Sequence, residues 1–316
     1  MVQVADRAGA VAFTGLVESV VSNPAARGVV ISNSAGSVSF GGGLQLHTVQ
    51  AAFAASGGGT VKVTGENNWL KSTGGAALSI HETSIGTAGI RLLRVDSTKS
   101  PSISLTRTGT GRLVVTGDGS DTPSQIAGIL MDSTYGADLV SVKVTRRVGE
   151  SPRAGGIPSV EVKTLNGPLR FTDATVAGAD GNGIEVNGST AAVVLDRTTV
   201  TGAADSGVVV TSDLGTSSVQ VTDSTISGSG ATGAARDGVR VVQSGSAAIA
   251  TTVTGSTFED NRGDQIQVVA RGGAEANATI SDNDLSSTGQ GILVNAGGPA
   301  YTGRLGYDIR DNTVLR

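Results

Sequence analysis

Apolar residues recur at fixed places in a short motif that appears six times between Leu169 and the end of the chain. In the first copy, Phe171 and Val176 enclose the polar and small residues Thr172-Asp173-Ala174-Thr175. The leading residues of successive copies lie 24 to 32 positions apart. They are Phe171, Leu195, Val221, Val253, Ile280 and Ile309. Self-similarity at a period of about 20–50 residues indicates a stacked repeat. The pattern therefore predicts a solenoid whose coils share their strands and differ in their loops.

A second motif lies between the copies of the first. A residue suited to a bend, usually Gly, leads two apolar residues that are two positions apart, as in Gly183-Ile184-Glu185-Val186. Its first apolar residues are Ile184, Val208, Val239, Ile266 and Ile292. We interpret Asp264-Gln265-Ile266 as a variant with Asp264 in place of the leading Gly. Each coil is thus predicted to contain at least two short strands.

Stacking the coils in phase places the apolar residues in four columns. Two columns are given above, and the others are Val176, Val200, Ile226, Phe258, Leu285, Val314 and Val186, Val210, Val241, Val268, Val294. Each buried Val, Leu or Ile contributes about 1.5–3 kcal/mol, and β-branched residues suit pleated surfaces. The columns therefore predict the core of an all-β fold, a parallel β-helix. The turn position of the first motif is small or polar in every coil: Ala174, Thr198, Ser224, Ser256, Asn283 and Asn312.

The paired motifs, for example VTGSTFEDNRGD and ISDNDL followed by GQGILVN, carry a resemblance. The chain resembles right-handed parallel β-helices of the pectin-lyase-like superfamily. More narrowly, it is similar to the repeat regions of very large secreted or surface-anchored bacterial proteins described as adhesin-like. The resemblance is evident over residues 169–316 and looser before them. It implies a right-handed solenoid and an extracellular or cell-surface location.

The chain is expected to be a single solenoid over residues 1–316, with looser coils in 1–145 and clear repeats in 159–316. At roughly 26 residues a coil, within the range of such repeats, it has about 12 coils. The polar segment 146–158 is either a protruding loop or a seam between two β-helical segments, and we favour the loop. Two other segments are ambiguous: Leu16–Val21 reads as a strand or a capping helix, and the alanine-rich Gln50–Ser56 has helical character.

Composition excludes several classes of protein. The formal net charge is −4 with no basic cluster and only 3% aromatic residues, which gives no support to nucleic-acid binding. The chain has no cysteine, so disulfides and thiolate metal sites are excluded. It shows no signal peptide and no apolar run of about 18 residues that would indicate a membrane span. Because the amino-acid sequence ends inside a copy of the first motif, we expect the chain to be a fragment of a longer protein.

Candidate catalytic groups are few. Glycosidases need two carboxylates at a fixed separation, and Asp173, Asp223, Asp282 and Asp311 recur at one corner, with Arg197 and Gly255 interrupting them. We interpret them as solvated corner residues. The hydrolase and lyase motifs of the resembled superfamily are absent, and neither histidine, His47 or His81, lies in a motif. No catalytic residue, cofactor or metal site is predicted.

Two surface features remain. Arg262-Gly263-Asp264 spells a tripeptide that some adhesins present to integrins, and it is kept as a weak surface candidate. Outer Thr and Ser positions form a broken row, which we interpret as a solvated polar wall: Thr172, Thr222, Thr254 and Ser281, with Asp196 and Arg310 between them.

The sequence therefore predicts a non-enzymatic, structural or adhesive β-helical segment of a large exported bacterial surface protein. One alternative is a carbohydrate-binding or carbohydrate-cleaving module; another is a subunit of an end-to-end β-helical filament. The expected partners are neighbouring coils of the parent protein or other copies of the chain, and a carbohydrate or a cell-surface ligand. Nucleic acid and membrane insertion are not expected.

Overall fold

The computed structural model describes residues 1–20, 23–147, 156–230, 236–286, 290–298 and 300–315. The chain divides into two compact units, Met1–Gly149 and Glu150–Arg316. The division falls within the segment 146–158 that the sequence marks as a loop or seam, and residues 148–155 of that segment lie outside the described residues. A single solenoid over the whole chain stays a prediction.

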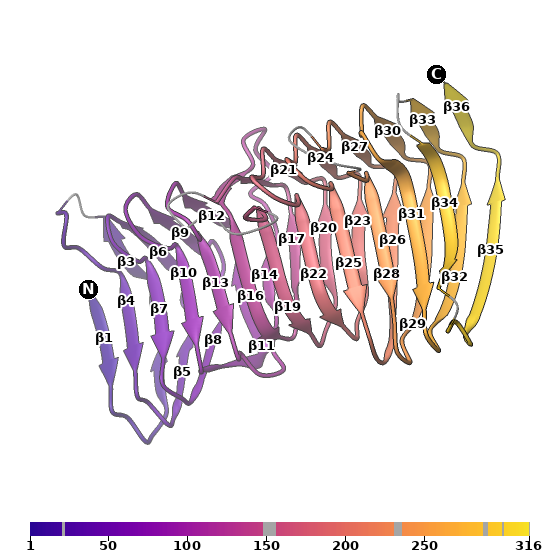
Figure 1. The fold of residues 1–316 in the computed structure, drawn as a ribbon. Helices are drawn as coiled ribbons and strands as arrows, with labels where there is room; N and C mark the ends of the chain where they lie inside the picture. Colours follow the sequence, from indigo (N-terminus) through magenta and orange to yellow (C-terminus); the bar gives the residue numbers. More distant parts are fainter. Residues whose placement is uncertain (21–22, 148–155, 231–235, 287–289, 299, 316) are drawn as a thin grey trace. The chain divides into compact units, whose positions relative to one another are not determined.

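The first unit contains six successive coils of three strands each among its described residues (Figure 1). Each coil gives one strand to each of three sheets, which we call A, B and C. Its part of sheet A is β1 (Val2–Ala5), β4 (Val29–Ser32), β7 (Phe53–Ser56), β10 (Leu78–His81), β13 (Ile103–Thr106) and β16 (Ile129–Thr134). Its part of sheet B is β2 (Val11–Phe13), β5 (Ser37–Phe40), β8 (Thr60–Val63), β11 (Ser84–Leu92), β14 (Leu113–Val115) and β17 (Ala137–Val140). Its part of sheet C is β3 (Val17–Val20), β6 (Leu44–Thr48), β9 (Trp69–Ser72), β12 (Arg94–Ser97), β15 (Ser124–Ala127) and β18 (Val142–Thr145).

The second unit repeats this arrangement, again with six coils in the described residues. Sheet A here is β19 (Val160–Leu165), β22 (Ile184–Ser189), β25 (Val208–Ser212), β28 (Val239–Gln243), β31 (Asp264–Arg271) and β34 (Gln290–Gly297). Sheet B is β20 (Leu169–Thr172), β23 (Val193–Asp196), β26 (Thr216–Thr222), β29 (Ala248–Thr254), β32 (Glu275–Ser281) and β35 (Arg304–Arg310). Sheet C is β21 (Thr175–Ala177), β24 (Thr199–Thr201), β27 (Thr225–Ser227), β30 (Thr257–Glu259), β33 (Asp284–Ser286) and β36 (Thr313–Leu315).

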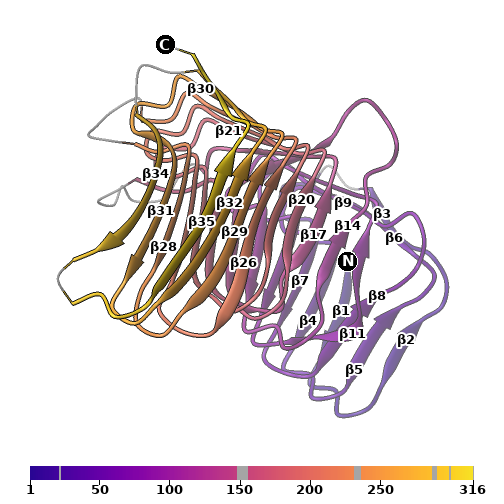
Figure 2. The same cartoon turned by 90° about the vertical axis from the view of Figure 1, so that its right-hand side faces the viewer.

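Each strand pairs in parallel with the equivalent strand of the next coil, as Figure 2 shows for the second unit. The described residues contain no helix. The predicted all-β parallel β-helix is therefore confirmed, and 12 sets of three strands agree with the expected number of about 12 coils. Each of the two ambiguous segments contains a strand among the described residues: β3 in Leu16–Val21 and β7 in Gln50–Ser56. In both, less exposed residues alternate with more exposed ones, which is the periodicity of a strand and not of a helix.

The predicted columns coincide with the observed register of the second unit. Val253 pairs with Val221 on one side and with Ile280 on the other. All members of the Phe171 column are fully buried except Ile309 in the last coil, which is 41% exposed. The strands that follow the turn pair Val176 with Val200, and Ile226 with Phe258. Each coil therefore adds one residue to each column of a continuous core.

The variant motif at Asp264 was misread by one position. The register places Val239 opposite Ile266, so Gln265, and not Asp264, lies opposite the leading Gly238. Gln265 is buried, and its side chain exchanges hydrogen bonds with Asn261: Asn261 Nδ2 donates to Gln265 Oε1 at 2.8 Å, and Gln265 Nε2 donates to the Asn261 carbonyl at 3.1 Å. These bonds allow a long polar side chain to replace a glycine at that bend.

Candidate binding face

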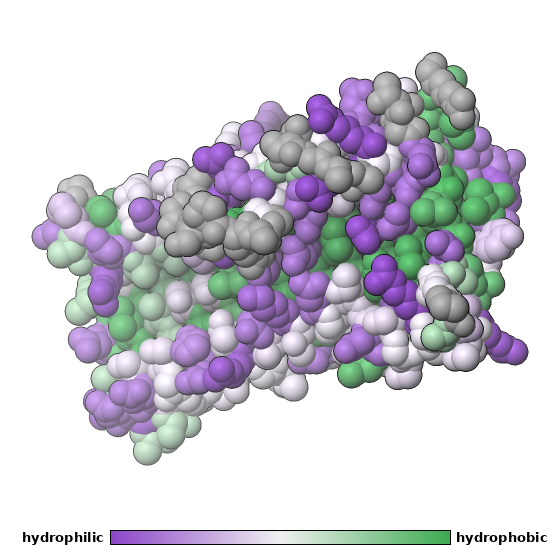
Figure 3. Space-filling view, viewed as in Figure 1, coloured by the Kyte–Doolittle hydropathy of each residue, from purple (hydrophilic) through white to green (hydrophobic). Residues whose placement is uncertain are grey.

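Sheet A of the second unit presents two outward columns of side chains, because residues two apart on a strand share a face. The first column is Glu161, Glu185, Val209, Arg240, Gln267 and Leu293. The second is Lys163, Asn187, Thr211, Val242, Val269 and Asn295. The chemistry thus changes along the stack, from carboxylates and amides in the first coils to aliphatic and guanidinium groups in later ones. Figure 3 shows hydrophobic residues among hydrophilic ones over β28, β31 and β34.

Side-chain hydrogen bonds fix the carboxylate end of this face. Asn182 Nδ2 donates to Glu185 Oε2, and Asn187 Nδ2 donates to Glu185 Oε1, both at 2.8 Å. Thr211 Oγ1 lies 2.6 Å from Asn187 Oδ1 and extends the network to the next coil. In the preceding coil, Lys163 Nζ lies 3.1 Å from Glu161 Oε1, and the Glu161 side chain is only 3% exposed. The network holds both glutamates in place across neighbouring coils.

A hollow of about 360 Å³ lies on the same face beside this network. The residues that line it are Asn182, Asp205, Ser206, Val209, Thr211, Arg236, Arg240, Val242 and Arg271. A second hollow of about 410 Å³ shares Thr211 and Val242 with the first and extends toward Lys163 and Asp213. Because the two share lining residues, they form one groove across neighbouring coils. We call the first hollow the arginine hollow.

Two of its arginines have acidic neighbours. Arg236 Nη2 lies 3.2 Å from Asp205 Oδ1. Arg240 Nη1 lies 3.9 Å from Asp237 Oδ2, which is beyond hydrogen-bond length. Burial raises the pKa of Asp237, and the nearby charge of Asp264 adds to this effect. The backbone N–H of Asp264 donates to Asp237 Oδ1 at 2.9 Å, which lowers that pKa in part.

The tripeptide Arg262-Gly263-Asp264 is divided between surface and interior. The Arg262 side chain is exposed. Asp264 is 6% exposed, and its Oδ2 accepts a hydrogen bond from Gln267 Nε2 at 2.7 Å. The backbone N–H of Gly263 donates to the carbonyl of Arg236 at 2.6 Å, so the tripeptide supports the wall of the arginine hollow. The structure does not present Arg262 and Asp264 together to solvent.

The histidines lie in the first unit, apart from each other. His81 is exposed at the end of β10. His47 packs edge-on against Trp69, with ring centroids 4.3 Å apart, and its pKa is lowered by burial and by the charge of Lys71.

Trp69 Nε1 donates to Asp96 Oδ2 at 2.9 Å, an interaction that no sequence motif indicated. The second atom of this carboxylate, Oδ1, accepts from the N–H of Gln125 at 2.9 Å. These bonds support neighbouring coils of sheet C.

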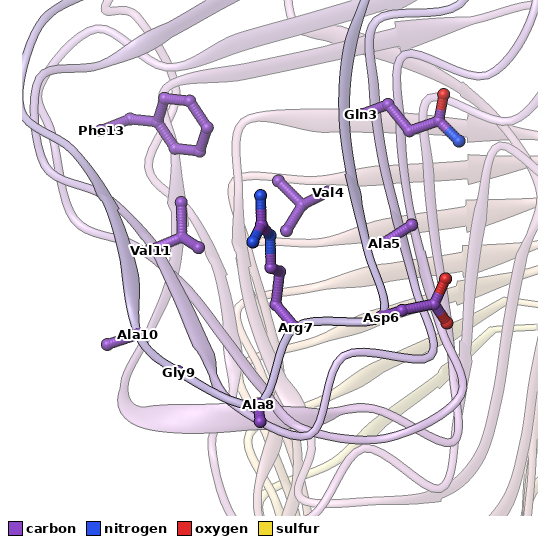
Figure 4. A pocket seen from close by; sticks show the side chains of 10 residues that line it. All are labelled: Gln3, Val4, Ala5, Asp6, Arg7, Ala8, Gly9, Ala10, Val11 and Phe13. Carbon is purple, nitrogen blue, oxygen red and sulfur yellow. The ribbon is translucent and has the colours of Figure 1, made fainter.

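A further hollow of about 690 Å³ lies on the inner side of the first coil (Figure 4). Val4, Val11 and Phe13 line it, and Arg7 extends between them. These are core positions of β1 and β2, so the hollow is the open side of the stacked core and not a separate cavity.

The arginine hollow was missed by the sequence analysis. Its signal was present in the second motif, whose middle residue is outward in every coil, and Arg240 takes that place in Gly238-Val239-Arg240-Val241. Arg236 and Arg271 lie outside both motifs, in a loop and at a strand end. No repeat could therefore have brought the three arginines together.

The described residues offer neither a cluster of metal ligands nor a membrane-spanning helix. No group of three or more acidic, histidine or cysteine side chains is arranged to hold a metal ion in this part of the chain. Within the same residues, no helix is long and apolar enough to span a bilayer.

Comparison with known proteins identifies the repeat. Residues 159–314 match the family model described as a right handed beta helix region. The match spans the clear repeats and gives the solenoid its handedness, so the predicted right-handed parallel β-helix is confirmed. No curated protein and no solved structure matches the chain.

Proposed function

We propose that this right-handed β-helix is a structural segment of a large exported bacterial surface protein, in which it acts as a rigid stalk or an adhesive surface. One observation carries the proposal. In the second unit, each coil adds fully buried aliphatic or aromatic residues to the same columns, as Leu195, Val221 and Val253 do. Such a core resists deformation over its whole length, because no coil can open without exposing apolar residues of its two neighbours.

Location and rigidity are separate parts of this proposal and need separate tests. Antibodies against the chain should label intact cells of the source bacterium, and protease treatment of intact cells should remove that label. A label that appears only after lysis would contradict export. Stretching the 316-residue chain between reference domains should give unfolding in several steps, coil group by coil group. Extension without any force peak would contradict the stalk.

A carbohydrate-cleaving module is the second candidate, and one observation favours it. Glu161 and Glu185 are register partners on the outward face of sheet A. Neighbouring parallel strands lie about 4.8 Å apart, close to the roughly 5–5.5 Å between the carboxyls of retaining glycosidases. The burial of Glu161 opposes this function, since a substrate must reach both carboxyls.

An activity assay decides between the two candidates. We expect no release of reducing ends or unsaturated products from plant or bacterial polysaccharides. If products appear, Glu161→Gln and Glu185→Gln should each abolish them, while Asp282→Asn, at a corner of another sheet, should not. Loss of activity in the two glutamine variants alone would replace the structural proposal with an enzymatic one.

An end-to-end filament is the third candidate. Its support is the outer edge of β34, β35 and β36, where Tyr307, Val314 and Leu315 are more than half exposed. A second copy of the chain is the partner that this candidate requires. Its test is the oligomeric state of the chain in solution.

A further inference from the structure

Three arginine side chains of the second unit line one hollow, although they come from different segments. Arg236 precedes β28, Arg240 lies within it, and Arg271 ends β31. Among the described residues of the lining, Asp205 is the only acidic one. Asp237 and Glu185 lie beside the hollow, so the three guanidiniums are balanced by three carboxylates in all. The chain as a whole has a formal net charge of −4, so a lining with three arginines differs from the rest of the molecule.

Arg236 has unused hydrogen-bonding capacity. One of its terminal nitrogens lies near Asp205, but its Nε is buried and has no acceptor among the described residues. A buried donor without a partner costs about 1–3 kcal/mol, and more when the group is charged. An acceptor that enters the hollow would remove this cost, since Arg236 belongs to its lining.

Of the three arginines, Arg271 is the one most accessible to a ligand. Its side chain is exposed, and it makes no ion pair or side-chain hydrogen bond among the described residues. Gln243 pairs with Ala270, so Arg271 lies opposite Ser244, four residues after Arg240 on the same face. At about 3.3 Å per residue, the two arginine positions lie roughly 13 Å apart along the strands. Val242 lies between these two positions, and Val209 pairs with Arg240 from the neighbouring strand β25, so both give the hollow an apolar floor.

We propose that the arginine hollow binds an extended ligand with two oxyanion groups, one held by Arg236 and Arg240 and the other by Arg271. The planar guanidinium fork matches carboxylate, sulfate and phosphate oxygens in pairs. The body of the ligand packs on Val209 and Val242, and Thr211 lies within reach of its polar groups. This function goes beyond a structural role, because a stalk needs no charged hollow.

Calorimetric titration of the full chain at low salt tests the proposal with three probes that differ in their oxyanion. They are sucrose octasulfate, inositol hexakisphosphate and trigalacturonate, and the tightest of them identifies the anionic group. At least one should bind, with an affinity that falls as salt is added, because surface charges are screened. Absence of binding by all three at low salt would overturn the proposal.

Variants locate the site. Arg240→Gln and Arg271→Gln should each weaken the binding probe about tenfold or more, since a charge-assisted hydrogen bond contributes about 1.5–3 kcal/mol. Arg91→Gln, an exposed arginine of the first unit, is the matched control and should bind as the parent does. Thermal melts of both hollow variants should equal that of the parent, because both side chains reach solvent.

Inorganic sulfate, which has a single oxyanion group, distinguishes binding at Arg236 and Arg240 from binding at Arg271. It should bind weakly to the parent, should be lost in Arg240→Gln, and should be retained in Arg271→Gln. Equal weakening of the probes by Arg91→Gln would mean non-specific attraction and would overturn the proposed site. A structural role for the chain would be unaffected by that outcome, so the two proposals fail independently.

Discussion

One corner residue of each coil in the second unit has a left-handed backbone. The φ angles at this corner lie between +45° and +60°. The residues are Asp173, Arg197, Asp223, Gly255, Asp282 and Asp311. Gly adopts this conformation without strain, and Asp is among the few other residues that adopt it readily. Backbone geometry therefore explains why aspartate recurs at this place, with no ligand needed.

Thr164 is poorly suited to its backbone, because it is β-branched and has a φ of +57°. The register places Gly188, with a φ of +71°, at the same point of the next coil. Thr164→Asn should raise the free energy of unfolding by about 0.5–1 kcal/mol, since left-handed φ costs ordinary residues roughly 1–2 kcal/mol. Urea unfolding measures the change. Thr172→Asn, on an extended strand, is the control and should give no gain.

Val253 tests the core at the level of one residue. It is fully buried between Val221 and Ile280, so Val253→Asp places a carboxylate where no partner exists in its column. We expect a loss of several kcal/mol in the free energy of unfolding, beyond the range of ordinary substitutions. Thr252→Asp, the outward neighbour on the same strand, should change it by less than about 0.5 kcal/mol. Similar melting temperatures for the two variants would contradict the assignment of the column.

At the scale of the element, hydrogen bonds link the turn after each corner to the next coil. In each bond a backbone N–H donates to a side-chain oxygen of that coil. The N–H of Thr198 donates to Ser224 Oγ at 3.0 Å, and that of Ser224 to Ser256 Oγ at 3.1 Å. The series continues from Ser256 N–H to Asn283 Oδ1 and from Asn283 N–H to Asn312 Oδ1, at 3.0 and 3.1 Å. This polar row inside the fold satisfies donors that the corner removes from the sheets.

Asn283 is a buried member of this row whose side chain makes three hydrogen bonds. Besides accepting from Ser256, its Nδ2 donates to the Val253 carbonyl and to Asn312 Oδ1, both at 2.9 Å. Asn283→Ala should lower the free energy of unfolding by about 2–4 kcal/mol, because it leaves buried groups without partners. It should also speed hydrogen exchange at the Ser256 N–H.

A conservative variant and a neighbour serve as controls for that prediction. Asn283→Ser keeps an acceptor like those of Ser224 and Ser256, so its loss should be smaller than that of Asn283→Ala. Asp282→Asn changes the exposed left-handed corner beside it and should be near neutral. Equal stability of Asn283→Ala and the parent would show that the row contributes nothing.

The sequence predicts the elements well where the pattern repeats and poorly where one residue decides the geometry. The columns of Val, Leu and Ile could be read because burial repeats at a fixed place in each coil. The strands β20 and β21 were interpreted as one motif with a turn inside it. They are separate strands because the backbone bends at Asp173, which has a left-handed φ. The one-residue error at Asp264 arose because Gln265 replaces a glycine through bonds to Asn261 that no pattern records.

At the scale of the whole molecule, the binding face was the part that could not be predicted. Its residues come from two motif positions and from loops between the motifs, and the loops differ from coil to coil. Arg236 and Arg271 meet at one hollow only because β28 and β31 are neighbours in the sheet. A solenoid thus repeats its core from coil to coil, while chemistry at its surface depends on residues that do not repeat.

The last coil leads to a prediction for the 316-residue chain in solution. Ile309 and Val314 belong to columns that are buried in the preceding coils, yet they are 41% and 59% exposed. The outer edge of β35 has no paired strand among the described residues. Exposed strand edges and apolar side chains favour pairing with another chain. We therefore expect the chain to associate as its concentration rises, with the last coil at the contact.

Hydrogen exchange and light scattering together check this expectation. At low concentration, amides of β35 should exchange faster than those of β28 around Val239, because they open without disturbing the rest of the core. At high concentration, the average mass should increase and the amides of β35 should become protected. Tyr307→Lys and Val314→Lys should reduce the association and leave the melting temperature nearly unchanged, since both side chains are mostly exposed. A chain that stays monomeric, with β35 as protected as β28, would contradict both the prediction and the filament candidate.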